Sequence, residues 1–205
     1  MSQIPTILHL VGSLGPKKVL DIGKGFGKYG FLIHEYIGID QKARIDPSLR
    51  LWEQSRITID AVEIDEDLLL PHLDHIYRKV YTGSILDTYK AFEEYDLVLM
   101  VDIIEHLPKQ EALEVVKFFM SRKISLIIAT PRDFFEQHLY ESEYENHVSH
   151  WTAADFSSLG QLDYQRIDAG MIYLLTPTKS DVSGFGQSFL KKLKKIRRVL
   201  INEFL

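Results

Sequence analysis

Short apolar runs alternate along the chain with longer segments whose apolar residues recur at helical spacing. The short runs predict strands at residues 19–22, 57–64, 79–82, 97–101 and 124–129. In two of these runs, LVLMV and LIIA, consecutive positions are apolar, which is typical of central parallel strands covered on both faces. The alternation therefore predicts an α/β fold, with a mainly parallel sheet and helices on both of its faces.

The same pattern predicts the helices and the end of the sheet. Apolar residues at helical spacing predict helices over residues 27–36, 70–78 and 112–120. Farther along, Thr152-Ala-Ala-Asp155 resembles a capping box and predicts the start of a short helix. Two further strands, 162–167 and 171–176, are joined by so few residues that they must pair antiparallel.

Length and charge divide the chain into a body and a basic end. The 205 residues are enough for one domain with a full core. We assign residues 1–176 to that domain, 177–188 to a linker and 189–205 to a basic amphipathic helix. The net charge is −5 for the whole chain but +5 for residues 185–205, so the body is acidic. The basic helix is compatible with packing on its own domain, with a homo-oligomer contact, or with peripheral membrane binding.

The sequence also bounds where the protein works and what it binds. It contains no cysteine, which excludes disulfides, thiolate metal sites and cysteine nucleophiles. We expect no membrane span and no signal peptide, because long uncharged apolar stretches and a charged start are lacking. The expected location is therefore cytoplasmic, peripheral to the membrane only if the basic helix binds lipid. The acidic body predicts no nucleic-acid partner.

The most informative stretch is VLDIGKGFGKYG, residues 19–30. A predicted strand ends there, glycines recur at Gly23, Gly25 and Gly27, and a predicted helix begins at once. Glycine lets the backbone turn sharply and approach a ligand closely, and the first N–H groups of a helix face a negative group. The spacing indicates a ligand-binding turn that follows an acidic strand residue, Asp21.

A second acidic residue ends the next predicted strand. In AVEID, residues 61–65, Glu63 stands where a carboxylate can accept both hydroxyl groups of a ribose. A solvated carboxylate at the end of a strand would give the same pattern. The glycine motif favours the ribose interpretation.

These motifs resemble those of the class I S-adenosylmethionine (SAM)-dependent methyltransferases. The resemblance covers about residues 15–176 and rests on VLDIGKGFG, on VEID and on YDLVLMVDIIEHLP at the fourth strand. It implies a Rossmann-like seven-stranded sheet of order 3-2-1-4-5-7-6, in which the last strand is antiparallel. It also implies SAM as the cofactor, bound over the carboxyl ends of the first two strands.

The resemblance assigns residues to each part of the cofactor. Glu63 would hold the ribose, and Asp102 would lie near the sulfonium and the methyl group. The methionine half would be surrounded by Asp21, Gly23, Gly25 and Gly27. Ser84 would lie in the loop beside the adenine.

Two positions depart from the pattern of the family. Lys24 replaces a small residue in the glycine motif, which the turn tolerates if the long side chain points to solvent while the backbone keeps its course. Ser84 replaces an aspartate that contacts the adenine amine in many members. Its hydroxyl can still form a hydrogen bond, and Asp87 is a substitute candidate.

The chemistry that the resemblance implies needs few groups. Methyl transfer from a sulfonium requires alignment of donor and acceptor, and a base only when the acceptor is a hydroxyl or a protonated amine. His106 is the first candidate for that base, because the pKa of histidine suits work near neutrality, and Glu105 is the second. The alternative is that neither residue acts as a base and that both only form a turn that supports the cofactor pocket.

Two long connections are candidate parts of the acceptor site. Residues 129–156 lack clear strand character, and loops of such length are often functional. Their candidate contacts are Phe134, Phe135, Tyr140, Tyr144, Trp151, His138, His147 and His150. The spacing His147-x-x-His150 fixes no third ligand, so no metal site is predicted. The insertion at residues 38–56, which contains Trp52, is either part of a lid or a surface excursion.

The sequence thus predicts methyl transfer from SAM to a small-molecule or glycan-type acceptor, with oxygen as the favoured atom. One alternative is an NAD(P)-binding α/β oxidoreductase or epimerase, but the sequence lacks the Y-x-x-x-K pair or comparable hydride machinery. A second alternative is a non-catalytic SAM-fold module that regulates or scaffolds. Lys24, Ser84 and the open identity of the base motivate that alternative.

Overall fold

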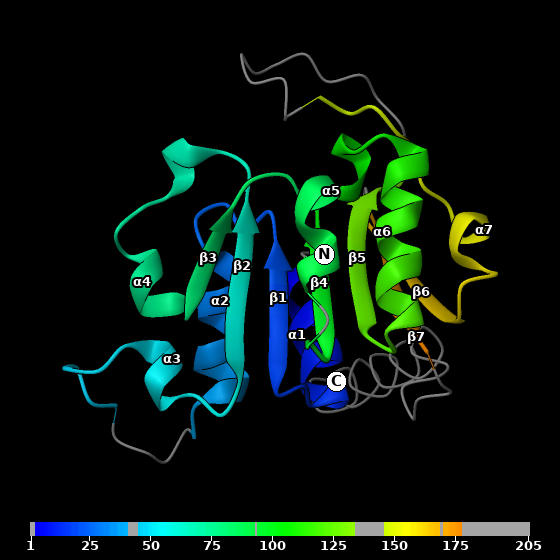
Figure 1. Ribbon diagram of the computed structural model, residues 1–205. Helices are drawn as coiled ribbons and strands as arrows, with labels where there is room; N and C mark the ends of the chain where they lie inside the picture. The colour runs from blue at the N-terminus through cyan, green and yellow to red at the C-terminus, as the bar shows by residue number, and fades with distance from the viewer. Residues whose placement is uncertain (1–2, 41–44, 93, 134–145, 169, 178–205) are drawn as a thin grey trace, which may run out of the picture.

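The computed structural model describes residues 3–40, 45–92, 94–133, 146–168 and 170–177. Within these residues the chain forms a seven-stranded sheet of order β3-β2-β1-β4-β5-β7-β6 (Figure 1). The strands are β1 (Lys18–Ile22), β2 (Thr58–Glu63), β3 (Lys79–Thr82), β4 (Leu97–Val101), β5 (Ser125–Pro131), β6 (Gln161–Ile167) and β7 (Gly170–Thr176). The first five strands pair parallel and β7 pairs antiparallel with both β5 and β6, which confirms the predicted fold class.

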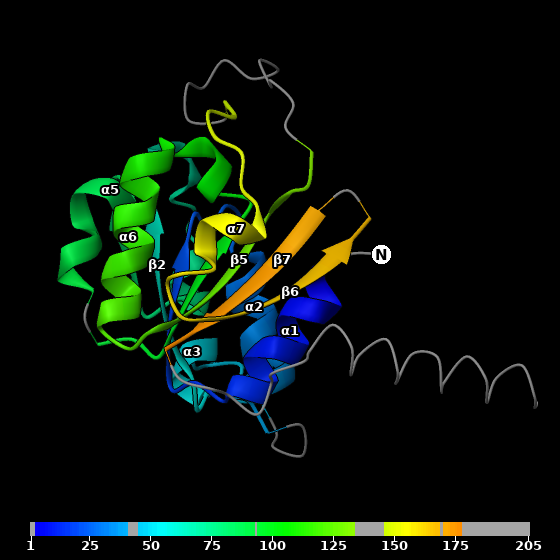
Figure 2. The ribbon, with the colours of Figure 1, turned by 90° about the vertical axis from the view of Figure 1, so that its right-hand side faces the viewer.

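Helices cover both faces of the sheet, as Figure 2 shows. One face carries α1 (Gln3–Leu14), α2 (Lys28–Ile33), which continues as a π-helical turn (His34–Gly38), and α4 (Leu73–Ile76). The other face carries α5 (Ile85–Thr88), α6 (Lys109–Ser121) and α7 (Ala153–Phe156). The remaining helical elements are α3 (Leu51–Gln54) and the 3₁₀ turns η2 (Glu66–Leu68), η3 (Tyr89–Ala91) and η4 (Ile104–His106).

Strand β4 shows why its sequence is apolar at every position. All five of its side chains are buried, because successive residues of a strand point to opposite faces and both faces are covered. Leu97, Leu99 and Val101 join the apolar cluster under α1 and α2. Val98 and Met100 join the cluster under α6. The central strand thus ties together the two layers of the core.

The helix predicted over residues 70–78 is wrong in its extent. Only Leu73–Ile76 are helical, and Tyr77 has extended backbone angles of φ −103° and ψ 139°. The chain leaves the helix there, and the phenol of Tyr77 lies against Asp21. The predicted capping box is confirmed, since the backbone N–H and the hydroxyl of Thr152 both donate to Asp155.

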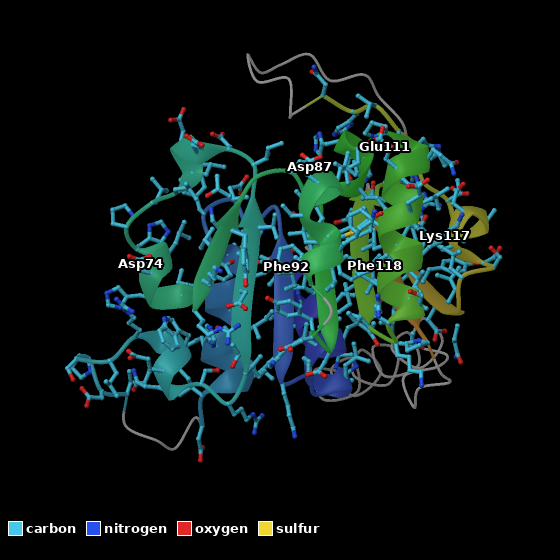
Figure 3. The ribbon with its side chains drawn as sticks, viewed as in Figure 1. Asp74, Asp87, Phe92, Glu111, Lys117 and Phe118 are labelled. Carbon is cyan, nitrogen blue, oxygen red and sulfur yellow. The ribbon has the colours of Figure 1, made fainter. Side chains whose placement is uncertain are left out.

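The inserted residues 38–56 form a surface excursion, so the lid interpretation is wrong for the part described. Helix α3 lies beside the amino end of β2, toward the end of the sheet opposite the glycine motif (Figure 1). The indole N–H of Trp52 donates to the carbonyl of Asp74, which fastens α3 to α4. Asp74 marks this place in Figure 3.

The predictions for the end of the chain remain predictions. Beyond Pro177, the linker predicted for 177–188 and the basic helix predicted for 189–205 lie outside the described residues. In the part of the chain that is described, no helix has the length and apolar character needed to span a membrane.

Candidate cofactor and active site

A pocket opens at the carboxyl ends of β1, β2 and β4, where parallel strands present their last residues at one edge of the sheet. Five of the site residues that the sequence predicted line this pocket: Gly23, Glu63, Ser84, Asp102 and His106. Asp21, Gly25, Gly27 and Glu105 lie outside its lining. The topology therefore gathers positions that are up to 83 residues apart in the sequence.

The glycine turn, residues 23–27, has the backbone that only glycine adopts without strain. Gly23, Gly25 and Gly27 have positive φ angles of 67°, 51° and 83°. At Gly23 the requirement is also steric, since a Cβ there would lie 1.8 Å from Cδ1 of Ile103. The turn ends at Gly27, whose carbonyl accepts from Phe31 in the first turn of α2.

Glu63 is held rigidly although it lines a pocket. Its Oε1 accepts hydrogen bonds from the backbone N–H groups of Ile64 and Asp65, at 3.0 and 3.2 Å. Its Oε2 accepts from the N–H of Gly25 at 3.1 Å, which joins the carboxylate to the glycine turn. The side chain is only 6% exposed. A carboxylate fixed in this way is preorganised to accept hydroxyl groups from a ligand.

Lys24 does not point to solvent, so the interpretation made from the sequence is wrong. The residue is 5% exposed, and its ammonium lies 3.7 Å from Oε2 of Glu63. The same ammonium donates to the carbonyl of Leu68 at 2.8 Å and to that of Gly25 at 3.2 Å. Burial lowers the pKa of Lys24, and the negative charge of Glu63 opposes that shift. The lysine is held inward because this carboxylate and these carbonyls give it partners.

Asp21 lies behind the glycine turn rather than in the pocket. It is 2% exposed and accepts a hydrogen bond of 2.6 Å from the hydroxyl of Tyr77. Burial raises the pKa of Asp21 to about 6, and the nearby charge of Glu63 adds to the rise while the Tyr77 hydrogen bond opposes it. Any influence of Asp21 on a ligand would pass through the glycine turn.

Ser84 lies in the pocket lining and also caps α5. Its hydroxyl accepts a hydrogen bond from the N–H of Leu86 at 3.1 Å, so its oxygen is partly engaged. Asp87, the substitute candidate, is exposed on α5 and lies outside the pocket lining (Figure 3).

Asp102 occupies an unusual backbone position at the end of β4. Its φ angle is 56°, uncommon for a residue other than glycine, and such conformations cluster at functional sites. Its exposed carboxylate accepts a hydrogen bond of 2.6 Å from the side-chain amide of Gln3 on α1. Sequence reasoning missed Gln3, because it predicted no element before the first strand.

The η4 turn is fastened to residues that follow more than 40 positions later. The backbone N–H groups of Val148 and Ser149 both donate to the carbonyl of Glu105, at 2.8 and 3.0 Å. The indole of Trp151 donates to the carbonyl of Ile104 at 3.1 Å. Trp151 is 1% exposed and stacks on Phe156, so its predicted place in an acceptor wall is wrong.

Two residues of this turn and one of the later segment form a polar cluster beside the pocket. A carboxylate oxygen of Glu105 and one ring nitrogen each of His106 and His147 lie within 4.8 Å of one another. Burial raises the pKa of Glu105 to about 8, to which the charge of Asp102 contributes and which a hydrogen bond from Thr130 opposes. His150 contacts the carbonyl of Arg132. The other predicted contacts of this segment, Phe134, Phe135, His138, Tyr140 and Tyr144, lie outside the described residues.

Solved structures share this fold at low sequence identity. The methyltransferase domain of bacterial CtHen1-C is 19% identical, with a TM-score of 0.59 over 86% of this chain and 97% of that one. A SAM-dependent methyltransferase from Archaeoglobus fulgidus is 15% identical, with a TM-score of 0.58 over 85% of this chain and 92% of that one. The small RNA methyltransferase HEN1 is 19% identical, with a TM-score of 0.60 over 87% of this chain and 25% of that one.

No protein-family model and no curated protein sequence matches the chain. The structure nevertheless has the fold of the class I SAM-dependent methyltransferases, in strand order and in the reversed last strand. The pocket lies where the sequence resemblance predicts the cofactor, between the glycine turn and the carboxyl end of β2.

Proposed function

We propose that the protein is an enzyme that transfers a methyl group from SAM to a hydroxyl of a small-molecule or glycan-type acceptor. One observation carries the proposal. Glu63 presents a buried, rigidly held carboxylate to a pocket that Gly23, the first residue of the adjoining left-handed turn, also lines. This arrangement suits a nucleoside with a charged substituent. The carboxylate can accept hydrogen bonds from the ribose hydroxyls, and the glycine turn lets the backbone come close to the substituent.

The pocket residues fit the parts of SAM in a consistent order. Glu63 would accept the ribose hydroxyls, and Ser84 with Ile85 would flank the adenine. Gly23 would allow close approach of the methionine half, and Asp102 would lie at the sulfonium end. The exposed carboxylate of Asp102 would favour a cationic sulfur there.

The transfer itself is an in-line displacement. An oxygen lone pair of the acceptor attacks the methyl carbon, the carbon–sulfur bond breaks, and its electron pair stays on sulfur to give S-adenosylhomocysteine. The hydroxyl proton passes to a base or to water. His106 lines the pocket at this end and is the candidate base.

Binding of the cofactor is the decisive measurement. Isothermal titration calorimetry of the full chain with SAM and with S-adenosylhomocysteine should show one site. Glu63→Ala should weaken it by about 1–3 kcal/mol, because a buried charged hydrogen-bond acceptor is lost. Glu66→Ala is the matched control, since Glu66 is exposed in the η2 turn three positions later and should leave affinity unchanged. Affinity for neither ligand, or equal effects of both variants, would refute the proposal.

The competing functions give different outcomes. Binding of NAD(P) in place of SAM would indicate the oxidoreductase or epimerase alternative. Binding of SAM without turnover would indicate a regulatory or scaffold module. Turnover is measured on a panel of sugars, phenols, aliphatic alcohols and RNA with labelled SAM. RNA belongs on the panel because one structural neighbour is a small RNA methyltransferase, but the acidic body makes it the less favoured acceptor.

A further inference from the structure

We propose that Glu105, His106 and His147 form a binding site for one divalent transition-metal ion at the edge of the cofactor pocket. Among the described residues, these three bring a carboxylate oxygen and two ring nitrogens within 4.8 Å of one another. A carboxylate with two imidazoles is a common ligand set for zinc and related ions. The pair His147-x-x-His150, which the spacing in the sequence suggested, is not the pair that the structure brings together.

The fold builds this cluster from two distant segments. Glu105 and His106 belong to η4, and His147 comes 41 residues after His106 in the sequence. The residue after His147 donates its N–H to the carbonyl of Glu105, and so does Ser149. These backbone hydrogen bonds hold the His147 side chain beside the η4 turn, and its ring centroid lies 4.9 Å from that of His106. The geometry therefore does not depend on the side chains alone.

One carboxylate oxygen of Glu105 gives a second, independent indication that an ion binds here. The residue is 3% exposed, and its Oε2 has no hydrogen-bond partner among the described residues. A buried polar atom without a partner is costly, and such atoms in native proteins call for an ion or a water. The same oxygen belongs to the carboxylate that faces the two histidines. A bound cation would satisfy it.

The hydrogen bond of His106 prepares its ring to bind a metal. Nδ1 of His106 lies 3.2 Å from the carbonyl oxygen of Asn146. A carbonyl only accepts hydrogen bonds, so Nδ1 carries a proton, and in the neutral ring the lone pair is then on Nε2. Histidines that bind metals are usually oriented in this way, with the second ring nitrogen donating to a carbonyl or a carboxylate.

The site would serve the acceptor rather than the cofactor, and this role rests on the proposed function. Three protein ligands leave coordination positions open, and His106 itself lines the pocket. An acceptor hydroxyl bound there would have a lowered pKa and would release its proton to solvent. The resulting oxygen would then attack the methyl carbon while the carbon–sulfur pair stays on sulfur, so that the metal ion would activate the acceptor hydroxyl in place of His106 acting as a base.

The test is metal binding by the full chain in the absence of SAM. Protein freed of metal with a chelator is titrated with ZnCl₂ and with MnCl₂ by calorimetry, and with CoCl₂ by visible absorption. We expect one ion per chain. His147→Asn and Glu105→Gln should each weaken binding at least about 100-fold, because even changes around metal ligands cost 10–100-fold. Circular dichroism and urea unfolding show whether the variants are folded.

His150→Asn is the matched control, since this histidine lies three residues after His147 and outside the cluster. It should bind metal as the wild type does. Absence of binding by the folded wild type, or an equal loss in His150→Asn and His147→Asn, would overturn the proposal. If Glu105→Gln fails to fold, His106→Asn takes its place.

The outcome is separable from that of the proposed function. Binding of metal without binding of SAM would keep the metal site and refute the methyltransferase. Binding of SAM by a folded chain that binds no metal would refute the metal site and leave the proposed methyltransferase function standing. Calorimetry of the same preparation with both ligands distinguishes the two results.

Discussion

The ammonium of Lys24 lies 3.7 Å from the carboxylate of Glu63, and both side chains are almost fully buried beside the pocket. A cation in the glycine turn is thus joined to the carboxylate that is proposed to bind ribose. Because three backbone N–H groups also donate to Glu63, the carboxylate keeps its place through several partners. The lysine adds a positive charge that compensates for burial of the negative one.

Lys24→Met should lower the free energy of unfolding by about 1–3 kcal/mol, because it leaves a buried carboxylate without its nearest cation. Methionine retains most of the apolar stem, so packing changes little. Urea-induced unfolding at pH 7 measures the effect. In Lys24→Met/Glu63→Gln, the loss should be smaller than the sum of the single losses, since the two side chains interact.

Lys28→Met is the comparison for this series. Lys28 is exposed at the start of α2, four residues after Lys24, and its substitution should change stability by less than about 0.5 kcal/mol. Equal losses in the two single variants would show that burial of the Lys24 ammonium contributes nothing.

Gly23→Ala should destabilise the protein more than Gly25→Ala does. Both positions have positive φ, which costs a residue with a Cβ about 1–2 kcal/mol. At Gly23 the new Cβ also meets Ile103 at 1.8 Å, whereas at Gly25 no atom outside its chain neighbours lies within 4 Å. Urea unfolding of both variants gives the difference, and Ile103→Ala in the Gly23→Ala background should recover the steric part. Similar losses at both glycines would contradict this reasoning.

The parallel strands could be predicted from sequence because burial on both faces leaves a local signature. The strand at 97–101, which is buried at all five positions, matches the prediction residue for residue. The edge strand at 79–82 matches as well, although none of its residues is fully buried. Helix α1 carried weaker signals. Pro5 and Gly12 look like breakers, yet Pro5 lies in the first turn, where proline is tolerated, and Gly12 faces Ile37. Local rules could not distinguish these positions from a loop.

The residues of the candidate site likewise include some that the sequence could predict and some that it could not. Glu63 could be predicted because a residue at the end of a parallel strand reaches the pocket whatever the loops do, and the place of Asp102 was implied by the resemblance to the methyltransferases. The direction of Lys24 could not be predicted, since it depends on the carbonyl of Leu68, 44 residues away. Likewise His147 meets His106 only through backbone hydrogen bonds between the two segments. Contacts of this kind have no signature in the local sequence.

The dependence of stability on pH should show that burial favours the protonated form of Asp21. Its pKa is about 6 in the folded protein, against an ordinary value of 3.8, so the folded state holds the proton more tightly. The resulting stabilisation is complete below pH 3.8 and is lost as the pH rises through 6. The stability of the wild type relative to Asp21→Asn should therefore fall by up to about 3 kcal/mol between pH 4 and 7.

Urea unfolding of both proteins at several pH values measures this difference, and Asn can still accept the Tyr77 hydrogen bond. His34 should give a pH dependence of stability with the opposite sign. Burial lowers the pKa of His34 to about 4, so its contribution is present above 6.5 and is lost as the pH falls through 4. The wild type relative to His34→Gln should thus gain stability as the pH rises. A flat Asp21→Asn difference curve would refute the raised pKa.

The two tryptophans of the chain should respond differently to the same substitution. Trp151→Phe keeps a ring against Phe156 but removes an N–H that donates to Ile104 at 3.1 Å and to Ser149 at 2.7 Å. Because these groups are buried, we expect a loss of about 1–3 kcal/mol. Trp52→Phe removes one N–H donor to Asp74 from α3, where water can replace it, and should cost less than about 1 kcal/mol.

Urea unfolding followed by circular dichroism compares the two variants without relying on the fluorophore that each lacks. Trp151→Phe should in addition weaken metal binding, because Trp151 helps to hold residues 147–149 against η4, whereas Trp52→Phe should leave it unchanged. If Trp52→Phe were the more destabilising change, the fastening of the later segment to η4 would contribute little to the fold. Equal metal affinity in both variants, with Trp151→Phe destabilised as expected, would mean that the backbone hydrogen bonds of Glu105 suffice to place His147.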